Sequence, residues 1–380
     1  MNIFTTVLSG NIDQLAAITA KHEHILLATD QNVSSLDQVQ ALINQLQQDC
    51  AQLTVIDNLP AEPRDEDVQN LIAQLPQSIS LVVGVGGGSV LDVSKLIAVL
   101  GVEADNAQRT EKFQQLLAGE TPAQRTELLL IPTTAGTGAE ATPNAIVAIP
   151  SRATKVGIIS PVMLPDYVLL APELTTSMPA HITASTSIDA LCHLIECFTA
   201  CISNPVGDNY AMIGMQKFFA NIDKVMTAPQ DMQVRLNLLW ASYYGGASIS
   251  HSGTHLVHAL SYPLGGKYRI PHGLANSLLL LPVMKFICEP CQEKLAQVYD
   301  LLPQSDKSLP SLDKAHALVD YLESLVVELG LPTKLNAIGI DASQLPELAA
   351  NAMEVKRLIN HSPVPVTEQD VLNMYQSICE

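Results

Sequence analysis

Residues 78–100 read SISLVVGVGGGSVLDVSKLIAVL, and they indicate a strand followed by a helix. Residues 78–85 are a largely apolar run, typical of a strand buried in a parallel sheet, and residues 90–100 have helical spacing. Four residues join them: Gly86, Gly87, Gly88 and Ser89. Glycines let a backbone approach a ligand closely, and a helix N-terminus offers free N–H groups to a phosphate. The segment therefore predicts a phosphate-binding turn.

A plain strand-to-helix turn is the alternative interpretation of these glycines. They do not follow a strict G-x-G-x-x-G, so an ordinary Rossmann fingerprint is not implied. Ser89 and Asp92 have the spacing of a capping box, which predicts that Ser89 caps the helix.

A second glycine-bearing loop, PTTAGTGAE at 132–140, follows the apolar run 127–131. Its threonine hydroxyls and backbone N–H groups suit hydrogen bonds to ribose or phosphate, although a connector without a ligand has the same composition. Two such loops at strand ends match the usual ligand position in open α/β sheets. Together they favour a nucleotide site.

The first half of the chain alternates between the two kinds of pattern. Strands are expected within 24–30, 52–59, 78–85 and 127–131, and helices within 35–49 and 65–77. Such alternation indicates βαβ units and a parallel sheet. After about residue 176 helical patterns dominate. We therefore expect an α/β dinucleotide-binding domain with a parallel sheet at 1–176 and an all-helical metal and substrate domain at 177–380.

Composition limits the classes of partner. The formal charge of −18 repels nucleic acid and anionic membrane surfaces. The apolar run at 274–288 is interrupted by polar residues and is too short for a bilayer span. The N-terminus lacks the pattern of a secretory signal. Seven cysteines without a regular framework predict reduced thiols, and the C-x-x-C at Cys288 and Cys291 is better explained by burial than by redox chemistry. We expect a cytoplasmic protein.

Asp30 ends the first predicted strand. An acidic residue at such a strand end can bind the ribose 2′-hydroxyl of NAD and would repel the 2′-phosphate of NADP. An ordinary turn aspartate is an equally good interpretation.

A carboxylate and several imidazoles indicate a metal site. Asp189 and His193 are four residues apart, which places them on one face of a helix. His258 and His272 follow across a stretch broken by proline and glycine. One carboxylate and three imidazoles suit a divalent transition metal such as Fe(II) or Zn(II). His251, His255 and His258 would share one helix face, so spacing alone does not say which of the three binds metal.

The motifs together resemble a known family. GGGSVLDVSK, PTTAGTGAE, LPDYVLLAPELT, ASTSIDALCHLIE and HALSYPLGGKYRIPHGLAN strongly resemble the iron-containing (group III) alcohol dehydrogenases, in the family's order and over nearly the whole chain. The resemblance implies a dinucleotide-binding α/β domain, a helical domain, a cleft between them for metal and nicotinamide, and a homodimer.

The resemblance also assigns residues. It implies the metal ligands Asp189, His193, His258 and His272. It implies the pyrophosphate loop Gly86, Gly87, Gly88 and Ser89, and the further cofactor contacts Asp30, Asp92, Thr133, Thr134, Thr137, Asn144 and Lys155. Metal-free relatives such as maleylacetate reductases do not keep the ligand set, so its presence favours a metal-dependent member. Asp30 stands where an aspartate in the family usually implies NAD rather than NADP.

One position departs from the family. Its alcohol dehydrogenases commonly carry a histidine four residues after the third ligand, as a proton relay, and this chain has Tyr262 there. A hydroxyl with an ordinary pKa near 10 is a poorer relay at neutral pH. His255 is a second candidate, which would line the pocket or orient the site, although an ordinary core or surface role is at least as good an interpretation. The HALSY string also resembles a branch that oxidises the sugar acid 3-deoxy-manno-octulosonate.

Three functions compete. The first is a metal-dependent, NAD-linked dehydrogenase that interconverts a primary alcohol and an aldehyde. The second is a related activity, such as a glycerol dehydrogenase or a dehydroquinate-synthase-like lyase. The third is a non-catalytic nucleotide-binding protein. The ligand pattern and the continuous motif order favour the first.

Overall fold

The computed structural model describes residues 5–152 and 154–379, which divide into two compact units. Unit 1 comprises residues up to Thr134 and Gly138–Ser177, and unit 2 comprises Ala135–Thr137 and the residues from Met178 onward. The predicted domain boundary after residue 176 lies one residue before the junction of Ser177 and Met178, where unit 1 ends.

Unit 1 is built on a six-stranded sheet in which every pairing is parallel, as predicted. Its strand order is β1-β8-β5-β4-β2-β3. The strands are β1 (Thr6–Ser9), β2 (His24–Ala28), β3 (Gln52–Ile56), β4 (Leu81–Gly86), β5 (Glu127–Pro132) and β8 (Tyr167–Leu170). The helices of this unit are α1 (Ala16–Thr19), α2 (Gln31–Ser34), α3 (Asp37–Asp49), α4 (Asp65–Ile72), α5 (Gly88–Leu100) and α6 (Asn106–Leu117).

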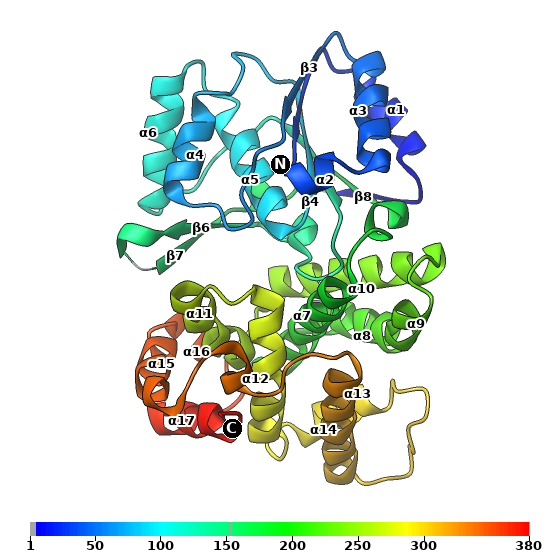
Figure 1. The fold of residues 1–380 in the computed structure, drawn as a ribbon, viewed down its shortest axis with the longest axis vertical. Helices are drawn as coiled ribbons and strands as arrows, with labels where there is room; N and C mark the ends of the chain where they lie inside the picture. The colour runs from blue at the N-terminus through cyan, green and yellow to red at the C-terminus, as the bar shows by residue number, and fades with distance from the viewer. Residues whose placement is uncertain (1–4, 153, 380) are drawn as a thin grey trace. The chain divides into compact units, whose positions relative to one another are not determined.

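Both faces of the sheet are covered by helices (Figure 1). Successive residues of β2 point to opposite faces: Leu26 packs in the apolar core with α4, α5 and α6, and Leu27 packs in the core with α1 and α3. Burial on both faces explains why the central strands β2, β4 and β5 are largely apolar.

A second, two-stranded sheet in unit 1 was not predicted. β6 (Asn144–Ile149) and β7 (Thr154–Ile159) pair antiparallel. β6 alternates half-buried and buried residues, the pattern of a strand with one solvated face.

Unit 2 forms helices and, among its described residues, no strand, as predicted. Its helices are α7 (Ala180–Thr199), α8 (Pro205–Phe219), α9 (Ile222–Thr227), α10 (Met232–His251), α11 (Leu256–Tyr268), α12 (His272–Ile287), α13 (Gln292–Tyr299), α14 (Ser311–Glu328), α15 (Leu345–Met353), α16 (Lys356–Ile359) and α17 (Glu368–Ser377).

Helix α7 is the buried centre of this unit. It packs against α8, α9, α10, α11, α12 and α13, and every residue from Ser187 to Thr199 is buried. A helix that is buried on all sides must satisfy its polar groups internally. The polar side chains of α7 therefore need partners on neighbouring helices.

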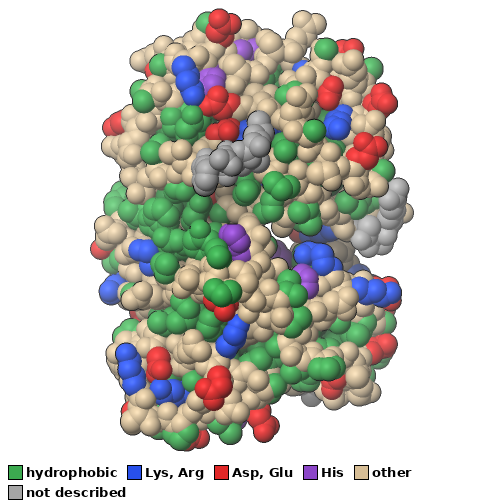
Figure 2. Space-filling view, turned by 180° about the vertical axis from the view of Figure 1, so that it is seen from behind, with side chains coloured by type: hydrophobic (Ala, Val, Ile, Leu, Met, Phe, Trp, Pro, Cys, Tyr) green, Lys and Arg blue, Asp and Glu red, His purple; other side chains and the backbone are tan. Residues whose placement is uncertain are grey.

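Among the described residues, no helix is both long and apolar enough to cross a membrane. On the face shown in Figure 2, acidic and basic side chains are scattered among one another.

Candidate metal and cofactor sites

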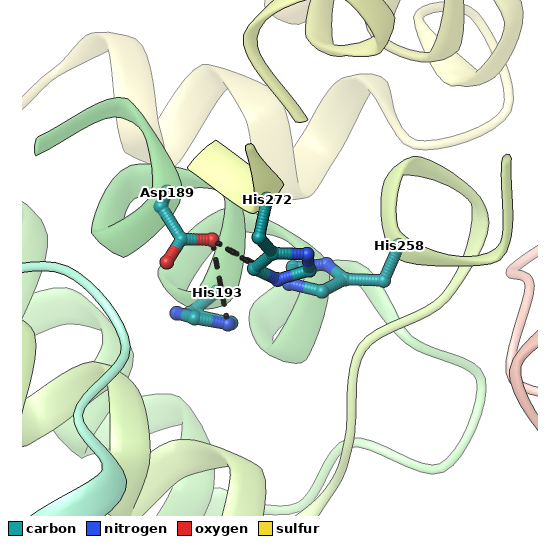
Figure 3. A group of neighbouring side chains, drawn as sticks. All are labelled: Asp189, His193, His258 and His272. Carbon is teal, nitrogen blue, oxygen red and sulfur yellow. Dashed lines mark ion pairs between the residues drawn. The ribbon is translucent and has the colours of Figure 1, made fainter. Parts of the chain in front are cut away.

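Four side chains from three helices of unit 2 converge on one point (Figure 3). Asp189 and His193 project from α7, His258 from α11 and His272 from the first residue of α12. One ligand atom from each lies within 4.8 Å of all the others. The structure thus brings together the four residues that the sequence analysis assigned to metal.

The carboxylate of Asp189 is the centre of this group. Its Oδ1 lies 3.8 Å from Nε2 of His193, 3.8 Å from Nε2 of His258 and 3.6 Å from Nε2 of His272. Asp189, His193 and His258 are buried, whereas the His272 side chain is 39% exposed. The ligand group is therefore open on the His272 side.

The far nitrogens of two of these imidazoles are engaged by other groups. Nδ1 of His193 lies 3.3 Å from the carbonyl oxygen of Gly136. Nδ1 of His258 is hydrogen-bonded to Oε2 of Glu196. With a proton on each Nδ1, the lone pairs on Nε2 face Asp189, as a metal ligand requires.

Asn276 joins the same group. It lies one helical turn after His272, and its Nδ2 donates to Oδ1 of Asp189 at 2.7 Å and lies 3.2 Å from Nε2 of both His258 and His272. Its Oδ1 is buried and has no hydrogen-bond partner among the described residues.

Charge states at the site suit a cation. Burial, followed by the neighbouring His193 and His272, lowers the pKa of His258 well below its usual value, so its imidazole is neutral. Burial by itself would raise the pKa of Asp189, but the three histidines and the Asn276 amide hold that pKa below its usual value. One ionised carboxylate and neutral imidazole nitrogens are the donor set of Fe(II) and Zn(II) sites, so the residues fit such a metal.

The two candidate catalytic residues lie in different places. The Tyr262 ring is half-buried in α11, with its centroid 6.3 Å from that of His272. His255 is fully buried, with Nδ1 3.2 Å from Oε1 of Glu196 and Nε2 2.9 Å from Oγ1 of Thr199. His255 thus contacts Glu196 rather than the ligand atoms, which fits its alternative role of orienting the site.

The prediction that His251, His255 and His258 share one helix face is wrong. α10 ends at His251 and α11 begins at Leu256. Gly253 between them has φ +136°, a conformation that L side chains rarely adopt and that ends the first helix. The break gives His258 a helix of its own.

In unit 1, the cofactor candidates lie at the carboxyl ends of three neighbouring strands. Asp30 follows β2, the glycine loop follows β4, and Thr133 and Thr134 follow β5. The two loops are in contact, since Thr133 N donates to the Gly86 carbonyl and Thr134 lies beside Gly87. These positions form one edge of the sheet, where α/β folds bind ligands.

The capping box predicted at Ser89 and Asp92 is wrong. α5 begins at Gly88 with Gly87 as its N-cap, so Ser89 lies inside the first turn and its hydroxyl donates to the Ala61 carbonyl. Asp92 instead accepts from Ile146 N at 3.0 Å and pairs with Lys95 at 3.1 Å. Because α5 already begins at Gly88, Ser89 and Asp92 both lie inside the helix and cannot form its cap.

Each remaining cofactor candidate has different neighbours within the protein, and the contacts of these residues with NAD stay predictions. Asp30 caps α2 through hydrogen bonds from Asn32 N and Val33 N. The Asn144 carbonyl accepts from Lys95 at 2.6 Å, and Lys155 pairs with Glu62 at 3.5 Å. Thr137 belongs to unit 2.

Sequence reasoning missed Glu196 and Asn276. Glu196 is three residues after His193 and Asn276 four residues after His272, so helical spacing from a predicted ligand was the available signal.

Comparison with known proteins identifies the family. The model of the family "Iron-containing alcohol dehydrogenase" matches residues 5–172, and that of "Fe-containing alcohol dehydrogenase family, C-terminal" matches residues 183–379. Long-chain-alcohol dehydrogenase 1 of Geobacillus thermodenitrificans (strain NG80-2) is 32% identical, over 97% of this chain and 93% of that protein. The 4-hydroxybutyrate dehydrogenase of Cupriavidus necator is 31% identical, over 86% of this chain and 85% of that protein.

A solved structure shows the same fold. The sulfoacetaldehyde reductase from Bifidobacterium kashiwanohense, in complex with NAD⁺, superposes with a TM-score of 0.85 at 24% identity, over 99% of this chain and 97% of that chain. These matches confirm the resemblance on which the residue assignments depend. The chain belongs to the iron-containing alcohol dehydrogenase family and is an oxidoreductase that acts on CH–OH groups.

Proposed function

We propose that this chain is a metal-dependent, NAD-linked dehydrogenase that interconverts a primary alcohol and its aldehyde. The observation that carries the proposal is the convergence of Asp189 with three histidine Nε2 atoms within 4.8 Å. Structural zinc sites commonly use four protein ligands as a closed shell, but here His272 is part-exposed, which leaves a side from which substrate can approach.

Different residues of the chain would bind the metal and the cofactor. Asp189, His193, His258 and His272 would hold Fe(II) or Zn(II), and the N–H groups at the start of α5 would hold the pyrophosphate of NAD. When bound, the metal supplies Lewis acidity at the substrate oxygen and NAD supplies the hydride acceptor. The Tyr262 hydroxyl, one helical turn after His258 and on a ring 6.3 Å from that of His272, is the candidate for moving the alcohol proton.

Asp30 favours NAD over NADP in this proposal. Its carboxylate stands at the carboxyl end of β2, beside the β4 loop, where it can accept from a ribose 2′-hydroxyl. A 2′-phosphate at the same place would meet a like charge.

The substrate is proposed as a polar alcohol. The relative from Cupriavidus necator is named for a hydroxy acid, and the HALSY string resembles enzymes that oxidise 3-deoxy-manno-octulosonate. The relative from Geobacillus is named for long-chain alcohols, so both classes belong in a substrate screen. A cytoplasmic homodimer is the form in which we expect the enzyme to act.

Reconstitution tests the proposal. Protein stripped of metal by a chelator and reloaded with Fe(II) under anaerobic conditions, or with Zn(II), is assayed by NADH absorbance against short alcohols, long-chain alcohols, hydroxy acids and sugar acids. We expect turnover only in the loaded forms. Full turnover by the metal-free protein would refute the metal's role, and binding of NAD without turnover in any loaded form would favour the non-catalytic alternative.

A further inference from the structure

Glu196 is a buried carboxylate that the proposed reaction does not use. It lies on α7, its side chain is 0% exposed, and its two oxygens face two consecutive residues of α11. Oε1 accepts from the backbone N–H of Val257 at 2.6 Å, and Oε2 is hydrogen-bonded to Nδ1 of His258. A carboxylate buried this deeply is unfavourable unless hydrogen bonds compensate for its lost hydration, and these two contacts do so.

The contact with His258 determines where that imidazole carries its proton. A neutral imidazole has one N–H, and a carboxylate oxygen at Nδ1 can only accept it. The proton therefore stays on Nδ1, and Nε2, which faces Asp189 at 3.8 Å, keeps its lone pair. The opposite tautomer would direct an N–H at the place where the metal is to bind.

The Val257 contact fixes the role of the other oxygen. Because a backbone N–H can only donate, Oε1 must accept, and an amide at this position would have to place its oxygen there and its NH₂ toward His258. His255 packs on the same carboxylate and is held by Thr199, so Glu196 is enclosed on this side too.

We propose that Glu196 is a positioning residue of the metal site: it fixes His258 in the tautomer that can bind metal, before metal arrives. The inference goes beyond the proposed function, because it concerns the affinity of the unloaded protein for metal and needs no substrate or nicotinamide. A hydrogen-bonded outer contact of this kind typically changes metal affinity by roughly 10–100-fold.

The substitution Glu196→Gln tests the proposal with almost no change in shape. The amide oxygen is needed by the Val257 N–H, so the amide NH₂ faces Nδ1 of His258. Nδ1 must then accept, and the imidazole proton moves to Nε2. Binding of metal to Glu196→Gln has to reverse that shift at the cost of an unsatisfied buried hydrogen bond.

Zn(II) affinity is measured by competition with a chelator on metal-free protein, and the tautomer of His258 by ¹⁵N NMR on histidine-labelled protein. The His258 signals are identified by their loss in His258→Gln. We expect Glu196→Gln to lose about 10–100-fold in Zn(II) affinity, with its bare imidazole nitrogen moved from Nε2 to Nδ1. The matched control is Glu140→Gln, the same change at a buried carboxylate of unit 1, which should bind Zn(II) as the unmodified protein does.

Three results would overturn the inference. One is unchanged Zn(II) affinity in Glu196→Gln. Another is reduced affinity with the His258 tautomer unchanged, which would indicate a structural role only. If the variant does not fold, the metal-free native protein decides the question alone, since a proton on Nε2 of His258 contradicts the proposal. If the Zn(II) affinities and the His258 tautomers are as expected but the loaded native protein shows no turnover, the result counts against the proposed function and not against this inference.

Discussion

Gly273 lies directly against the backbone of Ser185, so that a Cβ added at Gly273 would stand 2.6 Å from the Ser185 carbonyl oxygen. This close approach joins the start of α12 to α7, and it places His272 beside Asp189. Helix packing that depends on a glycine is a backbone requirement, which no side-chain adjustment can relieve.

Gly273→Ala should therefore weaken the metal site without removing a ligand. The added methyl group forces the first turn of α12 away from α7 and carries His272 with it. We expect Zn(II) affinity, measured by chelator competition, to fall about tenfold or more. Gly266→Ala is the control, because an added Cβ there meets nothing within 4 Å. Equal affinities in the two variants would contradict the packing argument.

His272→Ala should remove metal and activity while the chain still folds. The His272 side chain is part-exposed, so its replacement by alanine removes little buried packing. Zn(II) affinity should fall by more than the roughly 10–100-fold that outer contacts contribute, so that little metal is found after purification. His181→Ala, an exposed histidine in the first turn of α7, should keep full metal content. Retention of metal by His272→Ala would exclude that residue as a ligand.

Asp30→Asn separates two roles of one residue. Asparagine can still accept from Asn32 N and Val33 N, so the cap of α2 is kept, but the negative charge is lost. If Asp30 binds the NAD ribose, the ratio of kcat/KM for NAD over NADP should fall by about tenfold, as expected for loss of one charged hydrogen bond. An unchanged ratio would remove Asp30 from the cofactor site.

Tyr262→Phe keeps the ring beside His272 and removes only the hydroxyl. If that hydroxyl relays the proton, kcat should fall by roughly 100-fold while metal content and the KM for NAD stay the same. Steady-state kinetics with metal analysis of the same sample distinguishes this from a damaged site. A kcat equal to that of the unmodified enzyme would assign the proton transfer to water.

The buried Glu140 predicts a pH effect on stability. Burial raises its pKa to about 7, and its Oε1 has no hydrogen-bond partner among the described residues. Between about pH 4.5 and pH 7 the folded chain keeps a proton that the unfolded chain releases, so ionisation opposes folding as the pH rises. Glu140→Gln should be more stable than the unmodified chain at pH 8, by up to about 3 kcal/mol, and little different at pH 4. Urea unfolding at both values measures this, and an equal difference at both would contradict it.

Much of the fold could be predicted from sequence because its signals are local. The apolar strand, the glycine turn and the helix at 78–100 are continuous in sequence, and β4 and α5 lie where this pattern indicated. The β6–β7 pair was not predicted, because it belongs to neither the parallel sheet nor a helix. The break at Gly253 was missed because the histidine spacing on both sides imitates one continuous helix.

The metal ligands were found through motifs, and their partners were not. Glu196 reads as one polar residue in an apolar helix, and its contact with His258 joins residues 62 apart in the chain. Such a contact depends on how α11 packs on α7, which no spacing rule reports. The same is true of Asn276, whose amide reaches Asp189 on another helix.

The position of α7 links the lifetime of the protein to its metal supply. This helix carries Asp189 and His193, and it is also the element on which six other helices pack. A ligand that binds only the folded state stabilises it by mass action, with the gain growing as free metal exceeds the dissociation constant. In metal-starved cells we therefore expect unit 2 to open more often, so that proteases degrade the unloaded enzyme first and leave the cell with mainly metal-loaded molecules.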